Sequence, residues 1–391
     1  MAIPDALLGG LSSDEFLREY WQKKPLLVRG ALPGFTSPIS PEELAGLACE
    51  EEASARLILE KGGAYPWELR YGPFVEQDFA ALPEKHWTLL VQEVDRWVPD
   101  VARILDYFRF IPNWRIDDVM VSYAPEGASV GAHVDNYDVF LMQALGRREW
   151  RIGTTPVVDE EYVPDIDVSI LAGFQPDESY VLEPGDLLYL PPRFAHHGIA
   201  AGGDCMTYSI GFRAPSHEDI LGGFLTRVLE QIDPLERYSD PHLEAQDHPG
   251  LIRRSALERV RQIIRNAMPD EEIDRWFGYF VTEPTRGEVI TFPDEPWDVD
   301  DLHEAIDYDA VFERLSPTRF AYVEHERGTI SLFAHGDEYI LEPELAFAAP
   351  LLTGVTPLTG ETLREHIETP DFPLLLVELI NDGHIQAVTP E

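Results

Sequence analysis

The stretch from Gly131 to Gly153, GAHVDNYDVFLMQALGRREWRIG, places a histidine and an aspartate two residues apart at the start of a long apolar run. In an extended strand, side chains at positions i and i+2 point to the same face. His133 and Asp135 can therefore converge on one point, which makes them a candidate pair of metal ligands.

A third ligand is expected from the later segment SYVLEPGDLLYLPPRFAHHGIA, residues 179–200. A turn at 183–186, a buried strand at Leu187–Leu190 and two prolines precede His196 and His197. A histidine from this segment would complete the two-histidine, one-carboxylate triad that leaves positions open on an octahedral iron. His196 and His197 both remain candidates from the residues alone.

The His-x-Asp spacing occurs at two further places, so the spacing by itself is weak evidence for a metal site. His217 and Asp219 follow Ser216 at a predicted helix N-terminus, where positions i and i+2 do not share a face. His335 and Asp337 stand between two apolar runs, which indicates a turn. Of the three pairs, only His133 and Asp135 combine with a further histidine that follows two prolines at the end of a strand.

Four long segments, in chain order, resemble the Jumonji-C ribosomal oxygenases, and specifically their bacterial arginine-hydroxylating branch. They are EFLREYWQKKPLLVRGAL, HVDNYDVFLMQALGRREWRIG, EPGDLLYLPPRFAHHG and MTYSIGFRAP, and together they span residues 15–215. The resemblance implies a mixed α and β chain built on a double-stranded β-helix, the cupin or Jumonji barrel. The many short predicted strands separated by turns agree with such a barrel.

The same resemblance implies a ferrous centre held by His133, Asp135 and His196, with 2-oxoglutarate as co-substrate and O2 as oxidant. The family places the metal histidine two residues before a glycine, which favours His196 over His197. The implied chemistry is oxidative decarboxylation of 2-oxoglutarate to succinate and CO2, coupled to hydroxylation of an unactivated carbon.

Arg148 occupies the position at which the family binds the distal carboxylate of 2-oxoglutarate, with Ser122 as its hydroxyl partner. Neighbouring strand residues alternate faces, so at most one of Arg147 and Arg148 points inward. Tyr137 and Asp138 are candidates for the substrate arginine, because a guanidinium stacks on a ring and pairs with a carboxylate. Equally, both of these residues could be structural.

The resemblance implies hydroxylation of carbon 3 of an arginine in the sixteenth large-subunit ribosomal protein. Two alternatives share the chemistry, namely histidine hydroxylation of another ribosomal protein and demethylation of a methyl-lysine. A third alternative, from a different class, is a noncatalytic cupin-like binding module.

Charge and composition limit the partners. The net charge of −41 excludes nonspecific binding to nucleic acid phosphates and favours a basic partner. Salt adaptation is the other explanation, since the chain has only four lysines. No apolar run reaches the length of a membrane helix, no secretory start is recognised, and two cysteines give no disulfide framework. We expect a cytoplasmic protein.

We predict three domains: a Jumonji-C barrel with N-terminal helices at 1–215, a helical dimerisation region at 216–281 and a winged-helix-like domain at 282–391. The last two roles follow from the resemblance, which also implies a homodimer. Residues 281–391 hold 24 acidic residues against five arginines and no lysine. Direct DNA binding by this domain is therefore not expected.

Local signals predict several helices. Ser12 or Ser13 can cap a helix that continues to Tyr20, with Glu15 three residues after Ser12 as in a capping box, and Ser40 precedes a helix over 41–48. Helical periodicity is also read across 87–108, with an interruption at Pro99.

Overall fold

The computed structural model describes residues 4, 6–61, 67–284, 291–315, 318–354 and 356–388. It divides into two compact units at Ala214 and Pro215, within one residue of the first predicted domain boundary. The second predicted boundary, between residues 281 and 282, falls inside the second unit and stays a prediction.

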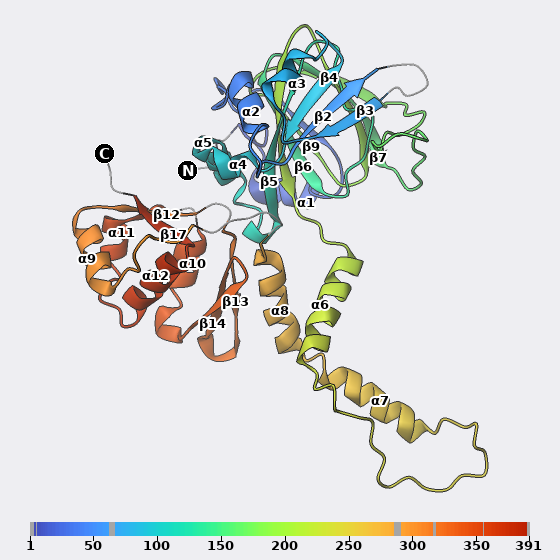
Figure 1. The fold of residues 1–391 in the computed structure, drawn as a ribbon, viewed down its shortest axis with the longest axis vertical. Helices are drawn as coiled ribbons and strands as arrows, with labels where there is room; N and C mark the ends of the chain where they lie inside the picture. The colour runs from blue at the N-terminus through green and yellow to red at the C-terminus, as the bar shows by residue number, and fades with distance from the viewer. Residues whose placement is uncertain are drawn as a thin grey trace. The chain divides into compact units, whose positions relative to one another are not determined.

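The first unit is built on two sheets (Figure 1). The larger has the strand order β1-β9-β6-β11-β5-β4-β2-β3, and the smaller has the order β10-β7-β8. The strands are β1 (Leu26–Val28), β2 (Ala55–Glu60), β3 (Trp67–Tyr71), β4 (Trp87–Val91), β5 (Ile116–Ala124), β6 (Asp138–Leu145), β7 (Arg148–Pro156), β8 (Glu178–Leu182), β9 (Leu187–Leu190), β10 (Phe194–Ala200) and β11 (Cys205–Phe212).

The two sheets face each other across a common apolar core, as a double-stranded β-helix requires. Val139 and Leu141 of β6 pack with Trp150 and Ile152 of β7 in this core. Phe140, between them, points to the opposite face and joins the core under the N-terminal helices. The predicted cupin barrel is confirmed, and the alternation tells which side chains enter it.

Short helices cover the outer face of the larger sheet. They are α1 (Ser13–Glu19), α2 (Pro41–Leu47), α3 (Glu76–Ala80), α4 (Val94–Trp97), α5 (Pro99–Ala102) and the 3-10 turns η1 (Arg103–Phe108) and η2 (Asn113–Arg115). Their apolar side chains share one continuous core with the outward-facing residues of β5, β6 and β11.

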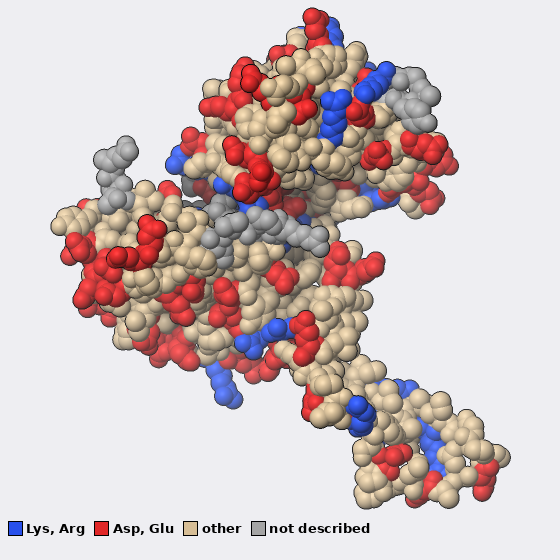
Figure 2. Space-filling view, in the orientation of Figure 1, with Lys and Arg blue, Asp and Glu red and all other residues tan. Residues whose placement is uncertain are grey.

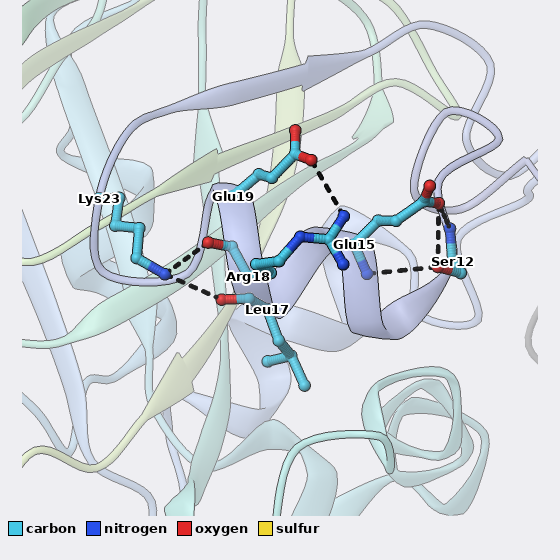
Figure 3. A network of polar contacts seen from close by, with 6 residues as sticks. All are labelled: Ser12, Glu15, Leu17, Arg18, Glu19 and Lys23. Carbon is cyan, nitrogen blue, oxygen red and sulfur yellow. Dashed lines mark hydrogen bonds and ion pairs between the residues drawn. The ribbon is translucent and has the colours of Figure 1, made fainter.

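Helix α1 shows how local sequence determines these boundaries (Figure 3). The Ser12 hydroxyl accepts the Glu15 backbone N–H at 3.2 Å, and the Glu15 carboxylate accepts the Ser12 N–H at 2.9 Å. At the other end, the Lys23 ammonium donates to the carbonyls of Leu17 and Arg18 at 3.2 and 2.6 Å. Both ends of the helix are therefore satisfied, and the predicted capping box is confirmed.

The prediction of helical periodicity across 87–108 was wrong at its start. Residues Trp87–Val91 form β4, which pairs with β2 on one side and β5 on the other. Helical turns begin only at Val94. The run Trp-Thr-Leu-Leu-Val is almost entirely buried, and a short buried strand has no periodicity that separates it from a buried helix.

The second unit begins with three helices and continues into a tail with two small sheets, ordered β16-β12-β17 and β13-β14-β15. Its elements are α6 (His217–Gln231), α7 (Arg254–Asn266), α8 (Asp270–Thr282), α9 (Val299–Asp307), β12 (Val311–Arg314), β13 (Phe320–Glu324), η3 (Glu326–Gly328), β14 (Ile330–Ala334), β15 (Asp337–Leu341), η4 (Pro343–Leu345), α10 (Ala348–Thr353), β16 (Leu358–Thr359), α11 (Gly360–Arg364), α12 (Phe372–Asn381) and β17 (Ile385–Val388).

Two cores stabilise this second unit. Phe224 and Val228 of α6 pack on Trp276 of α8, whereas α9, α10, α11 and α12 enclose a separate apolar core with both sheets of the tail. The winged-helix-like tail is confirmed by this arrangement of helices and hairpins. Among the described residues, no helix has the length and apolar character needed to cross a membrane.

Candidate metal and co-substrate site

His133 and His196 come from segments 63 positions apart that pair directly through their backbones. The His133 N–H donates to the His196 carbonyl at 3.0 Å, and the His196 N–H donates to the His133 carbonyl at 2.9 Å. The Arg193 N–H also donates to the Asp135 carbonyl at 2.7 Å. These bonds hold the loop that carries Asp135 against the start of β10.

The two imidazoles present the same nitrogen to the aspartate. Nδ1 of His133 lies 3.0 Å from the Gly131 carbonyl, and Nδ1 of His196 lies 3.0 Å from the Phe194 carbonyl. With the proton on Nδ1 donated to a carbonyl, Nε2 is left as the ligand atom. The Nε2 atoms lie 4.0 and 3.4 Å from Asp135 Oδ2.

His133, Asp135 and His196 form the one group of three potential ligands that converges among the described residues, with donor atoms within 4.8 Å of one another. Two neutral nitrogens and one carboxylate oxygen fit an iron site that retains open positions. Burial lowers the pKa of His196 to about 4, and the neighbouring His133 acts in the same direction. His196 therefore stays neutral and able to coordinate near pH 7.

The neighbouring His197 faces the other side of β10. It pairs with Arg151 across to β7, and it lies outside the converging group. Burial, and then the positive charge of Arg151, lower the pKa of His197. The structure thus brings His196 rather than His197 to His133 and Asp135.

Arg148 is buried in the barrel with 3% of its surface exposed, whereas Arg147 is exposed. The Nε and Nη2 of Arg148 both donate to the Cys205 thiol at 3.4 Å. A thiol is a weak acceptor, so the charge of the guanidinium is not neutralised by a carboxylate at this contact. The arrangement leaves a buried cation suited to an anionic ligand.

Ser122 lies on the same inner wall, opposite Thr207 in the β5–β11 pairing. Its hydroxyl donates to the Thr207 carbonyl at 3.3 Å. The Thr207 hydroxyl in turn donates to the Gln143 side chain at 2.9 Å. Since Ser122, Gln143 and Thr207 are all buried, the barrel holds a polar wall suited to a small polar ligand.

Comparison with known proteins agrees with this geometry. The chain matches the models for the JmjC domain over residues 103–220 and for the ROXA-like winged helix over residues 260–386. It is 34% identical, over 96% of this chain and 97% of the relative, to the ribosomal protein uL16 3-hydroxylase of Escherichia coli. The chain belongs to the ribosomal oxygenase family.

A second relative and a solved structure support this assignment. A probable ribosomal oxygenase of Haemophilus influenzae is 33% identical over 84% of this chain and 82% of its own length. The structure of an Escherichia coli ribosomal oxygenase in complex with cobalt and 2-oxoglutarate superposes with a TM-score of 0.82 at 34% identity, covering 96% of this chain and 98% of that one.

Tyr137 of this oxygenase lies two residues beyond the aspartate ligand candidate and is 40% exposed. Loss of water around its hydroxyl raises its pKa, and the negative charges of Asp135, Asp118 and Asp117 add to the effect. The ring is therefore a neutral, partly accessible surface close to the triad and to further carboxylates.

Asp138 was predicted as a candidate contact for the substrate arginine, but the structure places its side chain elsewhere. It is fully buried on the outer face of β6, the face shared with Phe140. Its carboxylate accepts from Gln22 at 2.9 Å, from Arg115 at 3.0 Å and from Tyr189 at 2.6 Å. These contacts favour the structural alternative, in which Asp138 connects β6 to the N-terminal segment.

Sequence reasoning missed Asp118, an acidic residue whose charge acts on the Tyr137 hydroxyl. Its carboxylate accepts the Glu93 backbone N–H at 2.9 Å. It lies on the face of β5 opposite to Val119 and Val121, which both pack in the outer core. Burial raises the pKa of Asp118 to about 7, and the neighbouring carboxylates of Asp117 and Asp95 add to the shift. Ser122 lies on the inner face of β5, and the alternation of a strand places Asp118, four residues earlier, on that same face.

Proposed function

We propose that this chain is an Fe(II)- and 2-oxoglutarate-dependent hydroxylase whose substrate is an arginine of ribosomal protein uL16. The observation that carries the proposal is the convergence of His133, Asp135 and His196 beside the buried cation of Arg148 in one barrel. Metal chemistry and co-substrate binding would then take place in the same barrel.

The three converging side chains would hold the iron, and Arg148 with Ser122 would hold the distal carboxylate of 2-oxoglutarate. When bound, iron and co-substrate supply the oxidising power for insertion of an oxygen atom from O2 into a C–H bond. The chain's own residues orient the ligands: carbonyls fix both imidazoles, Cys205 fixes the guanidinium, and the apolar barrel core excludes water.

Tyr137 and Asp118 are our candidates for recognition of the substrate arginine. A guanidinium stacks on an aromatic ring and pairs with a carboxylate. The negative charge of Asp118 acts on the Tyr137 hydroxyl, which places both groups in one electrostatic environment. The Escherichia coli relative, named as a uL16 3-hydroxylase, supports uL16 as the substrate.

The surface charge supports a basic partner. Figure 2 shows acidic side chains spread over the visible face of both units, with few basic ones among them. A net charge of −41 attracts a positively charged ribosomal protein over long range and repels nucleic acid. We also infer that the enzyme works in the cytoplasm, which fits an enzyme that acts on a ribosomal protein.

A homodimer is supported by the uncovered apolar faces of α6 and α7. Helix α7 has no buried residue, although its apolar side chains recur at helical spacing. The exposed apolar residues are Leu221, Leu225, Leu229, Leu257, Val260, Ile263 and Ile264. Such a face on a soluble chain indicates an interface. Light scattering should give twice the chain mass, and Leu229→Glu with Ile263→Glu should give the monomer.

The hydroxylase proposal is tested by succinate formation from 2-oxoglutarate with Fe(II), O2 and an arginine-containing uL16 peptide. Turnover stimulated by the peptide, and a peptide heavier by one oxygen, are expected from the wild type. Asp135→Ala and His196→Ala should abolish both. His197→Ala is the matched control, since this histidine neighbours the site without joining it, and it should retain activity.

Other outcomes separate the alternatives. Metal and 2-oxoglutarate binding without oxidation of the peptide would overturn the arginine assignment, and histidine-containing and methyl-lysine peptides would be assayed next. Absence of any turnover with all three peptide classes, despite intact ligand binding, would support the noncatalytic binding module instead.

A further inference from the structure

Trp150 carries a buried hydrogen-bond donor that the fold does not use. The side chain is 4% exposed and lies on the inner face of β7 with Arg148 and Ile152. Within the described part of the chain, no acceptor lies within hydrogen-bond reach of its Nε1. Buried indole N–H groups normally have a partner, because an unmet donor is costly in a protein interior.

The orientation of the indole is set by Gly198, which pairs with Trp150 across β10 and β7. A Cβ at position 198 would lie 2.7 Å from both Cζ3 and Cη2 of the ring, so only glycine leaves room for it. The outer end of the six-membered ring therefore covers Gly198. Nε1 belongs to the five-membered ring at the other end, and it points away from this strand contact.

The ring also lies between the two halves of the site. Its centroid is 5.7 Å from that of the His196 imidazole, and the Arg148 guanidinium carbon is 5.7 Å from the indole ring. A ligand that reaches from the metal triad to Arg148 must therefore pass beside the indole. An indole N–H can donate but cannot accept, which suits an anionic ligand.

We propose that the Trp150 indole N–H donates a hydrogen bond to a carboxylate oxygen of 2-oxoglutarate. The inference rests on the proposed function, since it assumes that the co-substrate spans the triad and Arg148. Trp150 then contributes a further contact beside the metal ligands, the Arg148 guanidinium and the Ser122 hydroxyl. The orphaned donor of the free protein is satisfied only when the co-substrate is bound.

The decisive measurement is the indole region of a ¹H–¹⁵N correlation spectrum of the Zn(II)-loaded protein, in which no turnover occurs. Trp150→Phe identifies the signal by its disappearance. Addition of 2-oxoglutarate should move the Trp150 indole proton downfield and slow its exchange with solvent. The signal of exposed Trp97 should stay in place.

Binding constants provide the second measurement. Replacement of Trp150 by 3-benzothienylalanine, which keeps the shape and substitutes sulfur for the N–H, should weaken 2-oxoglutarate binding roughly tenfold, as expected for one hydrogen bond to a charged group. Zn(II) affinity should change less than about twofold, since no metal ligand is altered. Trp97→Phe is the matched control and should bind as the wild type.

These measurements distinguish failure of the proposed Trp150 contact from failure of the proposed co-substrate site. An unmoved Trp150 signal together with wild-type 2-oxoglutarate affinity in the benzothienyl variant would overturn the inference. If Arg148→Met abolishes 2-oxoglutarate binding in the same experiment, the co-substrate site stands and only the role of Trp150 falls. If Arg148→Met binds normally, the proposed co-substrate site itself is wrong.

Discussion

Two segments of the chain share the His-x-Asp spacing but form different structures. His133 forms an isolated backbone bridge with His196 of β10, and Asp135 lies close to both imidazoles. His335 and Asp337 flank a tight turn between β14 and β15, with φ of 51° at His335 and 86° at Gly336. The same residue types thus form a ligand cluster in one unit and a hairpin turn in the other.

The second segment also has a buried histidine nearby, which makes the contrast sharper. His384 is fully buried, and its Nε2 lies 3.3 Å from Asp337 Oδ2. Yet no group in the described part of the tail brings three ligand atoms together. A buried histidine paired with a carboxylate is therefore not sufficient to form a metal site. The barrel differs because carbonyls orient both imidazoles so that their Nε2 atoms face one carboxylate.

The largest effect is expected from matched aspartate substitutions in the two segments. Asp135→Asn should lower Fe(II) affinity by more than about 100-fold and abolish succinate formation, because an amide replaces the anionic ligand. Asp337→Asn should leave metal content and turnover unchanged. Metal analysis after dialysis, with calorimetric titration of Zn(II), measures both.

Loss of metal from the Asp337→Asn variant would contradict the comparison, since it would make the tail a second metal site. Retention of full metal affinity by Asp135→Asn would show that the cluster in the barrel is not the metal centre.

A smaller effect is expected at Asp118, where function and stability should change in opposite directions. Asp118→Asn should lower kcat/KM for the uL16 peptide by about 100-fold, as for loss of a charged contact to a guanidinium. The same variant should be more stable near pH 8 by up to about 4 kcal/mol, since the fold no longer contains a carboxylate whose pKa burial raises to about 7. Peptide kinetics and urea unfolding measure the two effects.

The pH dependence of this effect has a defined sign. A raised folded-state pKa means that the fold favours protonated Asp118, so its contribution is present below about pH 4 and lost as pH rises through about 7. The stability gain of Asp118→Asn should therefore appear over this window. Peptide affinity of the wild type should rise as pH passes about 7, and a flat profile identical to that of the variant would remove Asp118 from the recognition site.

Local features of the sequence carried much of the fold. The capping boxes at Ser12 and Ser40 and the helix start after Ser216 lie where short-range hydrogen bonding predicts them. Trp87–Val91 was read wrongly because its strand exists only through pairing with β2 and β5, which are distant in sequence. Long-range pairing leaves no local signal in a short buried run.

The site shows the same division between local and distant information. The His133–Asp135 spacing is local, and the alternation of a strand separates Arg148 from Arg147. Asp138 could not be placed from its position beside Tyr137, because its partners Gln22 and Arg115 come from other parts of the chain. Asp118, by contrast, follows from alternation along β5 once the inner face is known.

The smallest effect is expected at His384, the histidine of the tail that has the environment of a ligand without the cluster. Burial lowers its pKa, and the carboxylates of Asp337 and Asp382 only partly oppose this. An unfolded chain therefore takes up a proton near pH 6.5 that the folded tail does not, so stability is full above this pH and declines as pH falls below it. Relative to His384→Gln, the wild type should lose a few degrees of melting temperature between about pH 7.5 and 5.

The informative quantity is the difference in melting temperature between the wild type and His384→Gln, since the many carboxylates of the tail contribute to both melting curves equally. A wild type that instead gains stability over His384→Gln as pH falls would mean that Asp337 and Asp382 outweigh burial and hold His384 charged. The tail histidine would then be an ion-pair partner, and the contrast with the neutral, ligand-competent His196 would be one of charge as well as of geometry.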